Sequence, residues 1–225
     1  LQRRRQRQMC IRDRDEAIKV IKKNKNRPFF LYLSHFAPHN PLQALRDDYD
    51  HFHHIEGEFS EELKVYSGML KALDRSVGRI LDTLEKNNLT DNTLIVLTSD
   101  NGGANYIHLS DINKPYRGWK LTHFEGGLHV PFMAKWPNKI KPGIEFNAPI
   151  HANDILPTFA AAAGAELPDD RIIDGVNLLP FLQNHNSEMP HETLYWLQGR
   201  LQTVLHENWK LITDHRTGKD WLFNV

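Results

Sequence analysis

Asp100 and Asn101 carry the side chains best suited to hold a metal ion in this sequence. They follow Thr98-Ser99 at the end of the apolar run 94–97, and two glycines come directly after them. Carboxylate and amide oxygens are hard ligands, which favour Ca²⁺ or Mg²⁺ over a soft metal. The same residues also suit a plain turn, because Asn-Gly is a common turn dipeptide. Since Ca²⁺ takes roughly six to eight ligands, these two residues would form only part of its shell.

A basic cluster lies further along the chain, before the apolar run 129–136. Arg117, Lys120 and His123 stand close to the double glycine at 126–127. Cationic side chains beside a metal ion would suit an anionic substrate. Taken alone, the cluster also fits a solvated basic loop.

His39 offers an imidazole after a third apolar run, 29–34, and Pro38 and Pro41 flank it. An imidazole can donate a proton to a leaving group. A lone histidine in a loop can equally be a surface residue. Taken together, a pair of oxygen ligands, a cation and an imidazole favour metal-assisted displacement at a tetrahedral anionic ester.

These residues follow segments whose patterns predict a sheet flanked by helices. Continuous apolar runs at 29–34, 94–99 and 129–136 are typical of buried strands. Apolar residues three or four apart predict a long helix over 60–88. Shorter helices are expected over 15–24 and from Asn153 or Asp154 to Ala163, with Gly164 as its end.

This order of elements predicts an α/β fold with a mainly parallel sheet, in which sites form at the carboxyl ends of strands. From about residue 191 the pattern changes to three short runs separated by turn-prone residues. The runs 194–197, 201–207 and 209–213 predict the start of a small antiparallel C-terminal subdomain.

The composition bounds the class of protein. The chain has 225 residues, of which 40% are hydrophobic, enough for a sizeable core. Lys+Arg and Asp+Glu both number 28, so no overall field favours nucleic acid. The one cysteine excludes an internal disulfide framework, and no apolar run is long enough to cross a membrane.

The first 14 residues are basic and lack apolar periodicity. We interpret residues 1–14 as a foreign or disordered leader and set them aside. The main domain is then expected over 15–190, and the C-terminal subdomain over 191–225.

Several motifs, in this order, resemble the type I sulfatase (arylsulfatase) family. The motifs are 29-FFLYLSHFAPHNPLQ-43, 94-LIVLTSDNGG-103, 117-RGWKLTHFEGGLHVPF-132, 151-HANDILPTFAAAAG-164, 174-DGVNLLPFL-182 and 207-ENWKLI-212. Each motif is weak alone, whereas the ordered set is specific. The resemblance implies an alkaline-phosphatase-like fold and hydrolysis of sulfate esters with one bound Ca²⁺.

The resemblance also implies roles for five residues. Asp100 and Asn101 are similar to two Ca²⁺ ligands of the family, and Lys120 to the lysine that contacts the sulfate. His39 is similar to the histidine that helps the leaving alcohol depart. His129 stands where many members carry arginine, so it is a candidate for substrate binding. His123 and Glu125 lie in the motif without an expected direct role.

None of the matching motifs contains the nucleophile that the family uses. Sulfatases use a formylglycine made from the Cys or Ser of a C/S-x-P-x-R motif, and Cys10 is followed by Arg12 where the proline should be. We therefore expect the nucleophile, and the remaining Ca²⁺ ligands, upstream of this chain. The chain is then the C-terminal portion of a periplasmic or secreted enzyme, inactive alone, that would act on a sulfated small molecule or glycan.

Two other functions stay open. A phosphatase or phosphodiesterase of the same superfold would use two Zn²⁺ ions, which Asp100 and Asn101 suit poorly. A non-catalytic anion- or glycan-binding derivative is the second alternative. The histidine run 51–54 could bind a transition metal, although a polar run of this kind is typical of a solvated loop.

Overall fold

The computed structural model describes residues 2–105, 108–109, 111–184 and 188–225. The chain divides into two compact units. The first comprises Leu1–Thr93 and Ala104–Ile112, and the second comprises Leu94–Gly103 and Asn113–Val225.

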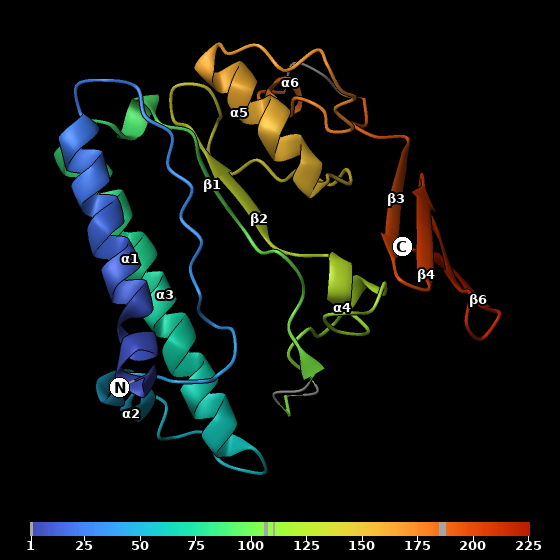
Figure 1. Cartoon of the computed structure of the whole chain (residues 1–225), viewed down its shortest axis with the longest axis horizontal. Helices are drawn as coiled ribbons and strands as arrows, with labels where there is room; N and C mark the ends of the chain where they lie inside the picture. Colours follow the sequence, from blue (N-terminus) through green and yellow to red (C-terminus); the bar gives the residue numbers. More distant parts are fainter. Residues whose placement is uncertain (1, 106–107, 110, 185–187) are drawn as a thin grey trace. The chain divides into compact units, whose positions relative to one another are not determined.

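Two long helices form the body of the first unit. Helix α1 spans Gln2–Asn24 and helix α3 spans Ser60–Lys86, and the two pack along each other (Figure 1). Ala17, Ile18 and Ile21 of α1 are buried, on the face that the spacing predicts. Helix α3 confirms the long helix expected over 60–88. Shorter elements of this unit are α2 (Arg46–Asp50) and the 3-10 helix η1 (Thr90–Asn92).

Helix α1 is longer at its start than the sequence predicts. It begins at Gln2, whereas the sequence predicts a helix only over 15–24. The backbone of residues 2–14 is thus helical and not irregular. Whether these residues are a foreign leader stays a prediction, because a helical backbone does not reveal their origin.

Asp48 ties the short helix α2 to α3. The two terminal guanidinium nitrogens of Arg75 donate to the two carboxylate oxygens of Asp48, at 2.6 and 2.7 Å. The Asp48 side chain is 3% exposed and that of Arg75 is 41% exposed. These hydrogen bonds hold the pKa of Asp48 below its usual range. The pair therefore stabilises the fold as long as the carboxylate is ionised.

The prediction of a strand over 29–34 is wrong, because the described residues form no strand there. The segment is extended and alternates between partly buried and exposed residues, but no described strand pairs with it. Phe30 is 71% exposed and Tyr32 is 81% exposed. The apolar run predicts burial on both faces, whereas a strand also needs a hydrogen-bonded neighbour, which the described residues do not supply.

The second unit begins with two paired strands. Strand β1 spans Ile95–Thr98 and β2 spans Phe132–Lys135, and they run antiparallel with Ile95 opposite Lys135. Both strands were expected, at slightly greater length. The short helix α4 (Glu125–Leu128) comes directly before β2.

A hydrophobic core lies beside this strand pair. Its buried residues are Trp136, Ile140, Leu178, Leu179 and Leu182. The helical elements of this region are η3 (Ala152–Asp154), α5 (Ile155–Ala163) and α6 (Leu179–Leu182). Gly164 follows α5 with φ of 65°, the left-handed conformation that glycine adopts easily, so the expected end of this helix is confirmed.

Asp154 holds the loops around this core together. It is fully buried, and its carboxylate accepts hydrogen bonds from the backbone amides of His151 (2.7 Å) and Val176 (2.9 Å). His191 approaches the same carboxylate with Nε2 at 2.8 and 2.9 Å. Because a buried carboxylate needs such partners, Asp154 is a structural anchor and not part of an open site.

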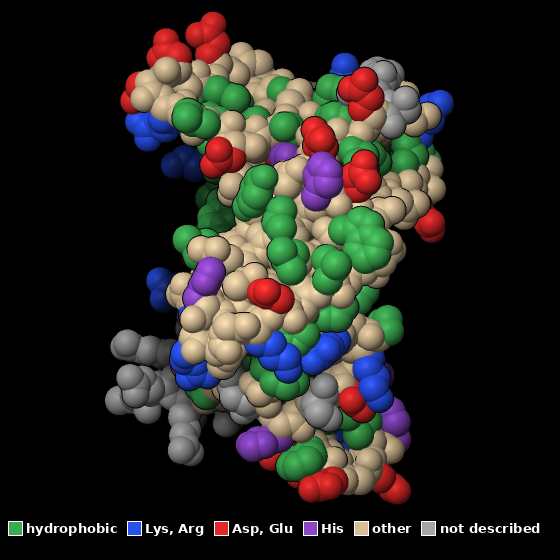
Figure 2. All heavy atoms as spheres, turned by 90° about the vertical axis from the view of Figure 1, so that its right-hand side faces the viewer, with side chains coloured by type: hydrophobic (Ala, Val, Ile, Leu, Met, Phe, Trp, Pro, Cys, Tyr) green, Lys and Arg blue, Asp and Glu red, His purple; other side chains and the backbone are tan. Residues whose placement is uncertain are grey.

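Four antiparallel strands form the C-terminal sheet, in the order β3-β4-β5-β6. They span Thr193–Gln198, Leu201–His206, Trp209–Asp214 and Lys219–Asn224. One face carries exposed apolar side chains, among them Tyr195, Leu211 and Leu222, which lie in one cross-strand row with Val204 between Tyr195 and Leu211. Figure 2, which looks from the right-hand side of Figure 1, shows hydrophobic side chains exposed on that side of the molecule.

The antiparallel C-terminal sheet confirms that part of the expected fold. Every strand pair among the described residues is antiparallel, so the mainly parallel sheet is not formed within them. The run 29–34 stands without a paired strand in the described part of the chain. None of the described helices is both long and apolar enough to span a membrane.

Candidate functional site

Asp100 and Asn101, the two residues proposed from the sequence as metal ligands, follow directly after β1. Asp100 is exposed, and no described residue donates a hydrogen bond to its carboxylate. The side-chain amide of Asn101 donates to the carbonyl oxygen of Gly102 at 2.9 Å, which leaves its Oδ1 as a free acceptor. Among the residues that the structure describes, Asp100 and Asn101 thus offer oxygen ligands that have no other partner.

The glycines after this pair allow two stretches of backbone to touch. The amide of Gly102 donates to the carbonyl oxygen of Gly127 in α4, at 3.1 Å. A Cβ on Gly102 would lie 1.8 Å from the carbonyl oxygen of Gly126, closer than any side chain can come. Close approach, and not only a bend, therefore requires glycine at 102.

The loop that carries Lys120 is fastened to the same place. The amide of Lys120 donates to the carbonyl oxygen of Gly103 at 3.0 Å. Asn113 reinforces the junction, because its side chain bonds both the amide (2.8 Å) and the carbonyl (3.0 Å) of Gly103. It also donates to the carbonyl oxygen of Gly118 at 3.0 Å. The structure thus brings Lys120, Asp100 and Asn101 to neighbouring loops.

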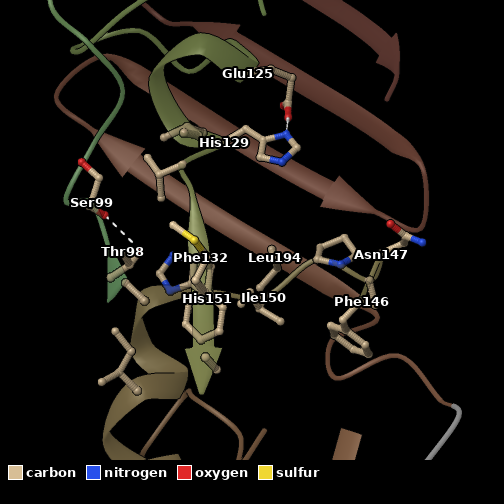
Figure 3. Close-up of a pocket in the computed structure, with 18 of the residues that line it drawn as sticks. Thr98, Ser99, Glu125, His129, Phe132, Phe146, Asn147, Ile150, His151 and Leu194 are labelled. Carbon is tan, nitrogen blue, oxygen red and sulfur yellow. Dashed lines mark hydrogen bonds and ion pairs between the residues drawn. The ribbon is translucent and has the colours of Figure 1, made fainter. Parts of the chain in front are cut away.

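His129 follows α4 and is held from two sides. Its Nδ1 lies 3.1 Å from Oε2 of Glu125, one turn earlier, as Figure 3 shows. Its ring stacks on Tyr116 with centroids 4.5 Å apart and planes 29° from parallel. The side chain is nevertheless 53% exposed. With Nδ1 facing a carboxylate, Nε2 is the ring nitrogen left for a ligand.

These residues line one cavity of the second unit. Asp100, Asn101, Lys120 and His129 all contribute to its wall. Figure 3 shows Thr98 and Ser99 on one side of the cavity and Phe146 and Asn147 on the opposite side. Its other lining residues include the aromatic side chains of Tyr116, Phe132, Trp196 and His151. Four of the five site residues expected from the sequence therefore line the same cavity.

His39 belongs to the first unit, so its relation to the other four stays a prediction. It is exposed, and its ring packs at a tilt against Phe36 with centroids 5.3 Å apart. Its Nδ1 lies 2.8 Å from the carbonyl oxygen of Asn40. A carbonyl only accepts, so Nδ1 carries the proton there and Nε2 is free to exchange a proton with a ligand.

The oxygen ligands fit Ca²⁺ as part of a shell. Asp100 and Asn101 supply hard oxygen atoms with no competing partner for the carboxylate, as this ion prefers. The described residues contain no cluster of three or more His, Cys, Asp or Glu side chains that could hold a metal alone. This includes the histidine run 51–54, where no metal cluster is formed.

Two residues beyond those expected from the sequence support the site. Glu125 contacts His129 through one oxygen and the ammonium of Lys210 through the other. Lys210 lies in β5 and is 2% exposed. Its separation of 85 positions from Glu125 hides the pair from any local pattern.

His123 is buried and does not line the cavity. It is 3% exposed, and its Nδ1 lies 2.8 Å from the hydroxyl of Thr203 in β4. Burial lowers the pKa of His123, and the Lys210 ammonium lowers it further. The neutral imidazole therefore packs loop 117–124 against the C-terminal sheet, without access to a ligand.

Comparison with known proteins assigns the family. The model of the family described as Sulfatase matches residues 13–165. A second model, N-sulphoglucosamine sulphohydrolase, C-terminal, matches residues 118–222. The two matches together cover the main body of the chain and its C-terminal sheet.

Curated relatives are sulfatases as well. Steryl-sulfatase of Rattus norvegicus is 38% identical over 186 residues, which cover 80% of this chain and 31% of the relative. The uncharacterized sulfatase YdeN of Escherichia coli K12 is 37% identical over 196 residues, which cover 86% and 34%. The chain thus spans about a third of the length of these relatives.

Solved structures share the fold. Ps i-CgsB in complex with k-i-k-neocarrahexaose superposes with a TM-score of 0.86 at 38% identity, covering 96% of this chain and 48% of that one. The putative sulfatase yidJ of Bacteroides fragilis superposes with a TM-score of 0.78 at 20% identity, covering 96% and 52%. These neighbours confirm the alkaline-phosphatase-like α/β class. Since the Sulfatase model matches well over half of its residues, the chain belongs to the sulfatase family.

Proposed function

We propose that this chain is part of a sulfuric ester hydrolase that removes sulfate from sulfated carbohydrates. The observation that carries the proposal is the convergence of Asp100, Asn101, Lys120 and His129 on one cavity. Oxygen ligands, an ammonium group and an imidazole in one wall suit a ligand that is both anionic and rich in hydroxyl groups.

Lys120 would contact the sulfate in this proposal. Its amide is fixed to Gly103, so the base of the side chain has a defined position beside the metal pair. An ammonium group there lowers the energy of negative charge that builds up on the sulfate oxygens during displacement. His129, held by Glu125 and Tyr116, would accept a hydrogen bond from a hydroxyl group of the substrate through Nε2.

His39 would protonate the leaving alcohol. Its Nδ1 proton is engaged by Asn40, so only Nε2 can face a substrate. A protonated Nε2 can donate to the ester oxygen as the bond to sulfur breaks. The proposal requires His39 to reach the cavity that the other four residues line.

Asp100 and Asn101 would hold part of the shell of one Ca²⁺ ion, with further ligands from outside this chain. When bound, Ca²⁺ offsets the charge of the sulfate group, and a formylglycine would supply the attacking oxygen. We expect both the formylglycine and the remaining ligands upstream of this sequence. We therefore expect no sulfate release by the 225-residue chain alone.

Sulfated carbohydrate is the favoured substrate class because of the solved relatives. One of them, Ps i-CgsB, forms a complex with k-i-k-neocarrahexaose. Another, BT4656, is 25% identical with a TM-score of 0.55 and was solved with its substrate D-Glucosamine-2-N, 6-O-disulfate. The exposed aromatic pair Tyr116 and His129 suits the face of a sugar ring. From the family resemblance we also propose that the parent protein acts in the periplasm or outside the cell.

Phosphonate or phosphate ester hydrolysis is the second candidate. A phosphonate monoester hydrolase of Silicibacter pomeroyi superposes with a TM-score of 0.72 at 20% identity, which relates the fold alone. The substrates share a tetrahedral anionic centre. The third candidate, a glycan-binding derivative without turnover, would keep the cavity and lack the nucleophile.

One set of measurements separates these functions. A protein that carries this chain together with its upstream half is assayed on p-nitrophenyl sulfate, p-nitrophenyl phosphate and a phenylphosphonate ester, and its metal content is measured. We expect release of sulfate and one Ca²⁺ per chain. Preference for the phosphorus esters with two Zn²⁺ ions would contradict the proposal, and tight glycan binding without any turnover would favour the binding derivative.

A further inference from the structure

The C-terminal sheet reaches the cavity through one buried lysine. Lys210 of β5 is 2% exposed, and its ammonium forms an ion pair with Oε1 of Glu125. The ammonium also lies 5.7 Å from the ring centroid of Trp196 in β3. A charged side chain so deeply buried needs a specific partner, and Glu125 is that partner.

The two carboxylate oxygens of Glu125 have different partners. While Oε1 contacts Lys210, Oε2 lies 3.1 Å from Nδ1 of His129. Lys210 thereby fixes the torsion angle of the carboxyl group, and the carboxyl group fixes which edge of the imidazole faces it. A carboxylate can only accept, so the Nδ1 proton of His129 points to Glu125.

Tyr116 completes the restraint on His129. Its ring stacks on the imidazole with centroids 4.5 Å apart, and this sets the plane of the ring while Glu125 sets its rotation. Tyr116, Glu125 and His129 line the cavity together with Lys120, and Figure 3 labels Glu125 and His129. Lys210 lines the cavity as well, but its ammonium is paired with Oε1 of Glu125 and Oε2 of Glu125 faces His129, so both charged groups are already engaged.

We propose that Lys210 and Glu125 are positioning residues that hold His129 in its Nδ1–H tautomer and present Nε2 to the ligand of the cavity. A hydrogen bond of this kind orients histidines at other sites, where it fixes both the tautomer and the direction of the ring. The arrangement itself does not depend on the proposed function; only the identity of the ligand, a sulfated sugar, rests on it.

The test follows the proton on His129 in the 225-residue chain. The chain is labelled with ¹⁵N-histidine, and long-range ¹H–¹⁵N spectra are recorded at about pH 8.5, above the usual histidine pKa of about 6.5. The signal of His129 is assigned by its loss in a His129→Gln variant. We expect the Nδ1–H tautomer in the wild type, with contacts between the Tyr116 and His129 rings in NOE spectra.

Two variants break the restraint, and one matched variant leaves it intact. In Glu125→Gln and in Lys210→Met, we expect the Nδ1–H population and the ring contacts to decrease. The conformational entropy that a glutamate side chain regains exceeds the free energy of one partly exposed hydrogen bond. Without Lys210, the Glu125 side chain therefore rotates away from His129. Lys219→Met is the control, because Lys219 lies on the neighbouring strand over Trp221, 5.0 Å from the ring centroid.

An unchanged or stronger Nδ1–H signal in both Glu125→Gln and Lys210→Met would overturn the inference. Lys210→Arg, which keeps the charge, should restore part of the wild-type signal. If Lys210→Met does not fold, as its loss of methyl resonances would show, Glu125→Gln decides the question alone, since it keeps the size of the side chain.

Binding of a sulfated probe separates the inference from the proposed function. D-glucosamine-2-N,6-O-disulfate is titrated onto the same variants, and the orientation of His129 predicts weakening of roughly five- to tenfold in both positioning variants. The effect should vanish in a His129→Gln background, because both residues act through His129. If the wild-type chain did not bind the probe, the proposed ligand would be wrong. The tautomer spectra would still decide whether Lys210 and Glu125 orient His129.

Discussion

Gly102 and Gly126 approach each other more closely than any residue with a side chain could. A Cβ on Gly102 would lie 1.8 Å from the carbonyl oxygen of Gly126, and one on Gly126 would lie 2.3 Å from the carbonyl oxygen of Gly118. Three loop segments therefore meet through bare backbone. This contact sets the distance between the metal pair after β1 and the loop that carries Lys120.

Replacing Gly102 by alanine should force this junction apart. We expect Gly102→Ala to lower the free energy of unfolding by about 1–3 kcal/mol, the usual cost of overpacking. Gly78→Ala in α3 is the control, because no atom lies within 4 Å of its added Cβ. Alanine there should raise the free energy of unfolding by about 0.5–1 kcal/mol. Urea denaturation measures both, and equal stability of Gly102→Ala and the wild type would show that the loops can separate freely.

The ion pair of Asp48 and Arg75 should make the first unit sensitive to acid. Because the pKa of Asp48 is lowered in the fold, the pair stabilises the native state above the unfolded pKa of about 3.9. That stability is lost as the pH falls below this value and through the folded pKa. Arg75→Met should lower the free energy of unfolding by about 2 kcal/mol at pH 7 and by much less at pH 3.

A solvent-exposed pair of the same type provides the comparison. Arg46 and Asp50 form an ion pair with side chains 81% and 48% exposed. Arg46→Met should change the free energy of unfolding by less than about 0.5 kcal/mol at either pH. If Arg75→Met behaved like Arg46→Met in urea titrations at pH 7, burial of Asp48 would not strengthen its pair.

His123 should contribute to loss of stability in mild acid. Burial lowers its pKa, so the folded state favours the neutral ring while the unfolded chain binds a proton below about pH 6.5. Stability from this residue is therefore present above about pH 6.5 and decreases as the pH falls. His123→Gln should make the melting temperature less dependent on pH between 8 and 5.

The pH dependence should decrease but not disappear in that variant. Burial lowers the pKa of His35 and of His151 as well. Thr203→Ser, which keeps the hydroxyl group beside His123, should retain the wild-type dependence. A slope unaltered by His123→Gln in differential scanning calorimetry would mean that His123 takes up its proton in the fold without cost.

Local patterns predicted the helices and the late strands well. The spacing of apolar residues predicts α3, and Gly164 ends α5 as a left-handed residue should. The run 29–34 shows the limit of such patterns. Its apolar character indicates burial, but the sequence of a strand does not contain its neighbour, and no described strand pairs with it.

The site could be predicted in part. Asp100, Asn101, Lys120 and His129 each belong to a recognisable motif and all line one cavity, while their roles stay predictions. The support from Lys210 could not be predicted, since it lies within 209-WKLIT and the surrounding apolar residues suggest that lysine faces solvent. In the structure, β5 buries Lys210, Ile212 and Asp214 and exposes Trp209, the reverse of the simple pattern. The ion pair with Glu125, 85 positions away, explains that burial.

Lys120 offers the most direct test of the proposed chemistry. Its amide is bonded to Gly103, so replacing the side chain removes the ammonium group and leaves the loop in place. In an active protein that contains this chain, Lys120→Ala should lower kcat/KM for a sulfate ester by about 100-fold or more, as loss of a charge-stabilising group does. Lys139→Ala, an exposed lysine outside the cavity wall, is the control and should retain wild-type activity. Steady-state kinetics decide the role of Lys120, because a decrease of less than about threefold corresponds to well under 1 kcal/mol and would refute contact with the sulfate.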